Sequence, residues 1–187
     1  VDHSTLEVNG ARQVGKTYLI NKFADEYFKQ KIYINLFELS GKQFLECYEQ
    51  AIAWKPGTKR PEHPLHDAFL LYEPSFQDTE DTVIIIDEIQ ESAEIYNRIR
   101  EFTRQFKCRF IVTGSYLGRV YDSEFRFSSG DVTKLTIYTL SYEEFLRAFD
   151  ESLYEQYCEL AIGKCEKDIY ASLKQIYDVY CQIRGYP

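Results

Sequence analysis

The chain has 187 residues, of which 44% are hydrophobic and 16% aromatic, and its formal net charge at pH 7 is −8. This composition excludes a disordered chain and suits one globular domain, or one domain with part of another. The negative charge provides no overall positive field for a nucleic-acid backbone, so nucleic acid stays open as a partner without being favoured. No apolar run approaches the ~20 residues that span a bilayer, and no signal-peptide pattern is present. We therefore expect a soluble, cytoplasmic protein with no membrane partner.

Residues 10–17 read GARQVGKT and match G-x-x-x-x-G-K-[ST], the pattern of a phosphate-binding loop between a strand and a helix. Its two glycines allow the backbone to wrap a phosphate closely. Lys16 is expected to reach the β- and γ-phosphates and Thr17 to offer its hydroxyl to Mg²⁺, while the following helix presents its positive end to the anion. The residues expected to bind the nucleotide are Gly10, Ala11, Arg12, Gln13, Val14, Gly15, Lys16, Thr17 and Tyr18.

Strand and helix patterns alternate along the chain. Alternating residues or continuous apolar runs predict strands over residues 5–8, 31–36, 82–88, 108–113 and 133–138. Apolar residues at helical spacing predict helices over residues 18–24, 41–52, 66–72, 92–106 and from a cap at Ser141 to about Phe149. This alternation predicts an α/β fold, the three-layer sandwich of P-loop NTPases, with a mostly parallel sheet.

Apolar residues define the expected buried faces of two of these helices. In the helix over 18–24 we expect Leu19, Ile20 and Phe23 on one face. In the helix over 92–106 the apolar positions follow steps of four, three and four residues, at Ile95, Ile99, Phe102 and Phe106. The five cysteines are widely spaced and form no C-x-x-C pair, which predicts reduced and mostly buried thiols.

From residue 151 onward the strand patterns stop and Tyr-rich helical segments follow. We place a domain boundary near Asp150. Residues 1–150 then form the P-loop domain, and residues 151–187 form a helical linker with the start of a further domain.

Two acidic residues, Asp87 and Glu88, end the buried strand predicted over 82–88 and are a second indication of a chemical site. Ligands of open α/β sheets bind beyond the carboxyl ends of the strands, so this pair should lie on the same edge as the phosphate-binding loop. There Asp87 would hold Mg²⁺ and Glu88 would activate an attacking water.

The next strand ends in Thr113-Gly114-Ser115, whose hydroxyls are expected to hydrogen-bond the γ-phosphate or the water, or to cap a helix. A phosphoryl-transfer site also needs positive charge beyond Lys16. Arg12, Arg119 and Arg126 are the candidates for an arginine finger, and the sequence does not select among them.

Four motifs occur in order: GARQVGKT at 10–17, IIIDEIQ at 84–90, FIVTGS at 110–115 and LSYEEFL at 140–146. Together they resemble the AAA-type P-loop ATPases of bacteria and archaea, which fuse an ATPase core to a C-terminal domain of unknown function. The resemblance implies ATP and Mg²⁺ as ligands and one strand between the P-loop strand and the strand ending at Asp87. It also implies that Asp87 and Glu88 form the Walker B pair and that residues 113–115 supply a sensor.

The RGYP sequence at 184–187 resembles a Gly-Gly-aromatic-Pro element near the start of the family's second domain. Two positions depart from the family pattern. Asp131 stands where an arginine is usual, and Thr139 stands where a proline is usual.

The leading hypothesis is an ATP hydrolase that drives a conformational change in an attached domain or a protein partner, including a second copy of the chain. Its catalytic residues would be Lys16, Glu88 and Ser115, and ATP and ADP its ligands. The alternatives are a nucleotide-dependent switch with little hydrolysis and a small-molecule P-loop kinase. A GTPase is disfavoured because the chain has no N-K-x-D sequence.

Overall fold

The structure is a computed structural model that describes residues 4–53, 62–114, 130–163 and 167–183. Two compact units make up the chain, the first from Val1–Gly10 with Lys16–Thr136 and the second from Ala11–Gly15 with Ile137–Pro187. These units do not test the boundary near Asp150, which stays a prediction.

One parallel sheet organises the first unit. Its strands are β1 (Thr5–Asn9), β2 (Gln30–Asn35), β3 (Thr82–Asp87), β4 (Arg109–Thr113) and β5 (Val132–Thr136). They lie in the order β2-β3-β4-β1-β5, and every neighbouring pair is parallel. The α/β class and the parallel sheet are therefore confirmed, as is the single strand, β4, between β1 and β3.

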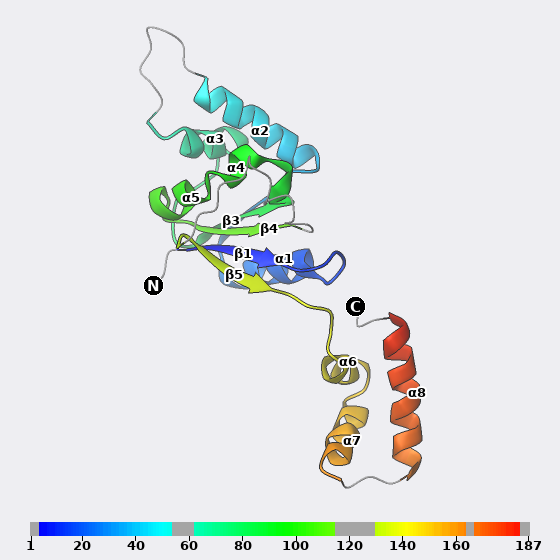
Figure 1. The fold of residues 1–187 in the computed structure, drawn as a ribbon. Helices are drawn as coiled ribbons and strands as arrows, with labels where there is room; N and C mark the ends of the chain where they lie inside the picture. The colour runs from blue at the N-terminus through cyan, green and yellow to red at the C-terminus, as the bar shows by residue number, and fades with distance from the viewer. Residues whose placement is uncertain (1–3, 54–61, 115–129, 164–166, 184–187) are drawn as a thin grey trace. The chain divides into compact units, whose positions relative to one another are not determined.

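Helices cover both faces of this sheet (Figure 1). The helical elements of the first unit are α1 (Lys16–Tyr27), α2 (Leu39–Ile52), α3 (Pro64–Tyr72), η1 (Ile89–Glu91), α4 (Ala93–Tyr96) and α5 (Ile99–Gln105). Figure 1 shows α1 on one side of the sheet and α2 to α5 on the other. This arrangement is the expected three-layer sandwich.

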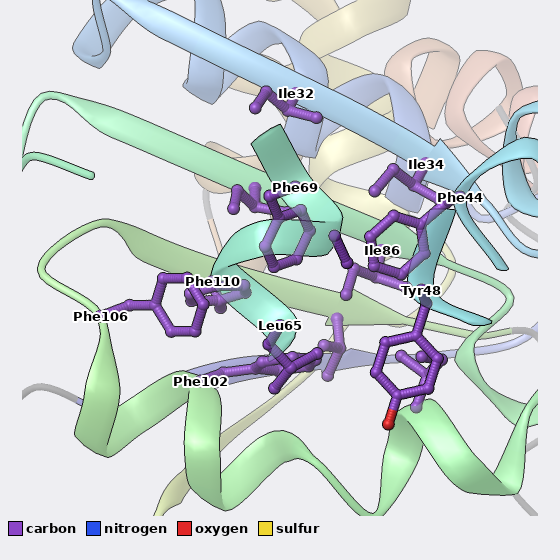
Figure 2. Close-up of a cluster of buried hydrophobic side chains, with 14 of the residues drawn as sticks. Ile32, Ile34, Phe44, Tyr48, Leu65, Phe69, Ile86, Phe102, Phe106 and Phe110 are labelled. Atoms are coloured by element: carbon purple, nitrogen blue, oxygen red, sulfur yellow. The ribbon is translucent and has the colours of Figure 1, made fainter. Parts of the chain in front are cut away.

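The main core lies between the sheet and α2 to α5, where aromatic side chains meet the apolar face of β2, β3 and β4 (Figure 2). Phe69 of α3 is at its centre and is fully buried. Its ring stacks on Phe44 at a centroid distance of 5.0 Å and meets Phe106 edge-on at 5.7 Å. Phe102 stacks on Phe110 at 4.5 Å, so α5 and β4 belong to the same cluster.

The helix expected over 92–106 is wrong as a single element, because the structure divides it into α4 and α5. The amide of Arg98 donates to the Ile95 carbonyl at 3.0 Å, a three-residue step that closes α4 with a tighter turn. All four expected apolar positions, including Phe102 and Phe106, are nevertheless buried. Apolar spacing identified the buried side chains but carried no information on the break.

The buried face expected for α1 is also wrong in part. Ile20 and Ala24 are buried at a spacing of four residues, whereas Leu19 and Phe23 are 47% and 44% exposed. Both sets are apolar, and only the direction of the helix relative to the sheet decides between them.

Of the four cysteines in the described ranges, Cys108 alone is buried, so the expectation of mostly buried thiols is wrong. Cys47 is partly exposed and Cys158 and Cys181 are exposed, while Cys165 lies outside the described residues. In the part of the chain that the structure describes, every helix is too short or too polar to cross a bilayer.

The second unit contains α6 (Tyr142–Phe149), α7 (Glu151–Ala161) and α8 (Lys167–Ile183). The cap expected at Ser141 is confirmed: its hydroxyl accepts from the Glu144 amide at 3.2 Å, and the Glu144 carboxylate accepts from the Ser141 amide at 2.7 Å. Tyr142 joins α6 to α8, because its hydroxyl donates to the Leu173 carbonyl at 2.9 Å. The segment after residue 150 is helical as expected.

Replacing Phe69 by alanine should strongly destabilise the fold, because it removes a buried ring from the centre of the core. We expect the free energy of unfolding to fall by about 3–5 kcal/mol, measured by urea denaturation. The matched control is Phe37→Ala, since Phe37 is 71% exposed and should cost less than about 0.5 kcal/mol. Similar losses in the two variants would contradict this description of the core.

Candidate nucleotide-binding site

The sheet brings the ends of three strands to one edge. Because β1, β3 and β4 are parallel and adjacent in the order β3-β4-β1, their carboxyl ends lie together. Asn9, Asp87 and Thr113 are the last residues of these strands. Val8 pairs with Thr113, and Ile86 pairs with Val112. The edge expected from the sequence therefore exists.

The loop after β1 contains three residues with positive φ, at Gly10 (148°), Gln13 (65°) and Gly15 (86°). Glycine adopts such angles at little cost, whereas Gln13 holds a left-handed conformation that is uncommon for a residue with a side chain. Outliers of this kind often mark ligand-binding loops.

Lys16 begins α1 and is 7% exposed, and its Nζ donates to the Gly10 carbonyl at 2.9 Å. The ammonium group therefore lies beside the first residue of the loop. Among the other expected nucleotide contacts, Val14 is buried, whereas Ala11, Arg12 and Gln13 are exposed and Tyr18 is 69% exposed.

Asp87 is 5% exposed and accepts hydrogen bonds on both carboxylate oxygens. Thr17 Oγ1 donates to Oδ2 at 3.0 Å, so the expected pair of metal-binding residues is in direct contact. Tyr33 OH donates to the same oxygen at 2.7 Å, and the Glu88 amide donates to Oδ1 at 2.9 Å. Three donors from α1, β2 and the turn after β3 thus orient one carboxylate.

Tyr33 was not predicted from the sequence as a site residue. Its strand was predicted, but the contact depends on the register, in which Tyr33 pairs with Ile85 and Asn35 pairs with Asp87. Burial, and then the hydrogen bond and negative charge of Asp87, raise the pKa of Tyr33 well above its ordinary value. The hydroxyl therefore stays protonated and donates.

Glu88 follows β3 in a left-handed conformation, with φ 50° and ψ 45°. Its carboxylate accepts a hydrogen bond from Gln90 Nε2. Gln90 is 5% exposed. No role was predicted for it from the sequence, although it lies inside the motif over residues 84–90. The expected general base is thus held by a neighbouring amide in this structure.

Thr113 ends β4, on the sheet face that also carries Asp87 according to the strand register. Its side chain is fully buried, and Oγ1 has no hydrogen-bond partner among the described residues. The expected catalytic residue Ser115 and the arginine-finger candidates Arg119 and Arg126 lie outside the described residues, as do the RGYP residues 184–187.

Asp131 shows what the first departure from the family pattern does. It is 7% exposed and accepts from Arg104 Nε at 3.0 Å, with Arg100 Nε at 3.7 Å. Its carbonyl accepts from the Thr5 amide, at the start of β1. Because β1 has five residues, at about 3.3 Å each this point is roughly 15 Å from the edge that carries the phosphate-binding loop.

The sequence profile of the AAA domain matches residues 2–146. The chain belongs to the AAA domain family. The resemblance to AAA-type ATPases is therefore confirmed, and residues 2–146 form a nucleotide-binding domain of the ATPase type. The second domain implied by that resemblance stays a prediction. A search of curated proteins found no match to this chain.

Among solved structures, this AAA chain is similar to the structure of Drosophila ORC bound to DNA, with 17% identity and a TM-score of 0.56. The match covers 97% of this chain and 53% of that one, so the chain spans about half the length of the matched structure. At this identity the likeness shows the fold alone. The chain is also similar to the Aeropyrum pernix ORC2 protein in ADPNP-ADP complexes, with 16% identity, a TM-score of 0.44 and coverage of 78% and 45%.

Replacing Asp131 by alanine should weaken the fold of the AAA domain and leave ATP binding unchanged. The variant loses a buried carboxylate paired with Arg104, which we expect to cost about 1–2 kcal/mol in urea denaturation. ATP affinity, measured by calorimetry, should stay within twofold because the residue lies far from the loop.

Asp81→Ala is the matched control, because the Asp81 pair with Lys29 is exposed on both sides and should contribute little to the free energy of unfolding. A loss of ATP affinity in a folded Asp131→Ala protein would refute a purely structural role.

Proposed function

We propose that this AAA domain binds ATP with Mg²⁺ and hydrolyses it, using the change to move an attached domain or a protein partner. The observation that carries the proposal is the contact of Thr17 with Asp87 beside the loop that begins at Gly10 and ends at Lys16. A buried lysine, a hydroxyl and a carboxylate in this order are what a polyphosphate and its metal require.

The residues present fit Mg²⁺. Thr17 and Asp87 provide hard oxygen donors, and Mg²⁺ prefers one or two such groups together with phosphate oxygens and water. Because the Thr17 hydroxyl donates a hydrogen bond to Asp87, its oxygen keeps its lone pairs for the metal. In the described ranges no three His, Cys, Asp or Glu residues gather closely enough to hold a metal ion. Phosphate oxygens and water would therefore have to complete the coordination.

In the proposed reaction the backbone amides from Gly10 to Thr17 bind the phosphates and Lys16 neutralises charge on the transferred group. Glu88 takes a proton from the attacking water, and Thr113 offers its buried hydroxyl to the γ-phosphate or to that water. Ser115 is proposed to act beside Thr113. The bound Mg²⁺ supplies positive charge at the phosphates.

A nucleotide-dependent switch is the second candidate, and one contact favours it. The Gln90 amide donates to the Glu88 carboxylate. A hydrogen bond of this kind stabilises the charged form and makes the carboxylate a weaker base, so a protein that keeps it would bind ATP and hydrolyse it slowly. The partner in either case is proposed to be a protein or a second copy of the chain.

The Drosophila ORC in the matched structure is bound to DNA. We do not propose DNA as a partner of this chain, because a net charge of −8 opposes binding to a nucleic-acid backbone. Residues 151–187 are proposed as the helical connection to whatever the ATPase domain moves.

Lys16→Ala should weaken ATP binding by at least about tenfold, because it removes a charged donor from the phosphates. The measurement is calorimetric titration of ATP, ADP and GTP with Mg²⁺, in which ATP and ADP should bind more tightly than GTP. Lys22→Ala is the control, since Lys22 is an exposed residue of the same helix. Equal ATP affinities in the wild type and in Lys16→Ala would remove the central assignment.

Glu88→Gln should keep ATP affinity and lower the turnover rate about 10²–10⁴-fold, because the amide cannot accept the proton of the attacking water. The measurement is release of inorganic phosphate without an added acceptor, which also separates a hydrolase from a kinase. Glu80→Gln, an exposed residue before β3, should leave the rate unchanged. Turnover that survives in Glu88→Gln would exclude Glu88 as the base, and negligible turnover in the wild type would favour the switch.

A further inference from the structure

Tyr33 projects from β2 onto the face of the sheet that carries Asp87. In the parallel register Tyr33 pairs with Ile85, so Asp87 lies two residues beyond its direct partner, on the same face. A tyrosine side chain is long enough to bridge this diagonal. Its hydroxyl reaches Asp87 Oδ2 at 2.7 Å.

The hydrogen bonds to Asp87 leave little freedom to its carboxylate. Two oxygens offer about four lone-pair sites, and three are used by Tyr33, Thr17 and the Glu88 amide. Tyr33 and Thr17 share Oδ2. Without the Tyr33 hydroxyl, Oδ2 would keep Thr17 as its single donor. The Thr17 hydroxyl is also a proposed metal ligand.

We propose that Tyr33 is a positioning residue for Mg²⁺, one that fixes the Asp87 carboxylate so that one of its lone-pair sites stays available to the metal. The inference rests on the proposed function, since it concerns the same metal site. Phenylalanine would fill the same place in the strand and has a similar preference for β structure. The positioning role therefore belongs to the hydroxyl of Tyr33 and not to its ring.

The test compares ATP affinity in excess EDTA with ATP affinity in Mg²⁺, by calorimetry on the full chain. The quantity of interest is the factor by which Mg²⁺ tightens ATP binding. Partners that orient metal ligands typically contribute 10–100-fold to metal affinity, so Tyr33→Phe should reduce this factor about tenfold. ATP affinity in EDTA should stay within twofold, because Tyr33 makes no contact that the phosphates need.

Tyr48→Phe is the matched control. Tyr48 is buried and its hydroxyl accepts from Arg98 Nε at 3.0 Å, so this variant also loses a hydrogen bond of a tyrosine inside the AAA domain. It should leave the Mg²⁺ factor unchanged. Equal reductions in the two variants would show a general loss of stability and overturn the proposal.

A double-mutant cycle with Asp87→Ala shows whether Tyr33 acts through Asp87. Once Asp87 is removed, Tyr33→Phe should cause no further loss of the Mg²⁺ factor. A further loss in the Asp87→Ala background would overturn the positioning role. So would an unchanged Mg²⁺ factor in Tyr33→Phe alone, or a wild-type ATP affinity that is the same with and without Mg²⁺. Absence of ATP binding in the wild type would instead refute the proposed function itself.

Discussion

The carboxylate of Asp87 is the point on which the candidate site depends. It joins α1 through Thr17 and β2 through Tyr33, residues that lie 70 and 54 positions away in the sequence. A charged group that is 5% exposed needs such partners, since an unsatisfied buried carboxylate is costly. The donors are supplied by separate elements, so the site forms only when the sheet and α1 are in place. Folding and preorganisation of the site are the same event.

One face of the sheet packs against the aromatic core, and the other carries the candidate site. Ile86 joins the aromatic core (Figure 2). Neighbouring residues of a strand point to opposite faces, so Asp87 faces the other side of the sheet. All six residues of β3 are buried, which is why the strand reads as a continuous apolar run ending in an acid. The rigid packing around Phe69 therefore fixes the strand that presents Asp87. Any substitution that shifts β3 in the core also shifts the carboxylate.

Contiguous patterns were predictable from the sequence, and contacts between distant elements were not. The loop from Gly10 to Thr17, the buried strands and the cap at Ser141 are encoded within short stretches, and the structure has each of them. The roles of Tyr33 and Gln90 were not predicted, because the partner of Tyr33 depends on strand register and that of Gln90 on the turn at Glu88. Periodicity alone also did not predict the buried face of α1. This helix has two apolar stripes, and its packing against the sheet determines which of them is buried.

Asp131 shows how a departure from a family pattern can be structural. The strand it precedes, β5, is an edge strand with four of its five side chains exposed, so side-chain burial contributes little to its position. Backbone bonds to β1 and the pairing of Asp131 with Arg104 and Arg100 supply what burial does not. An arginine at this position would face two other arginines and repel them. Asp131 is therefore matched in charge to the two arginines that α5 presents beside it.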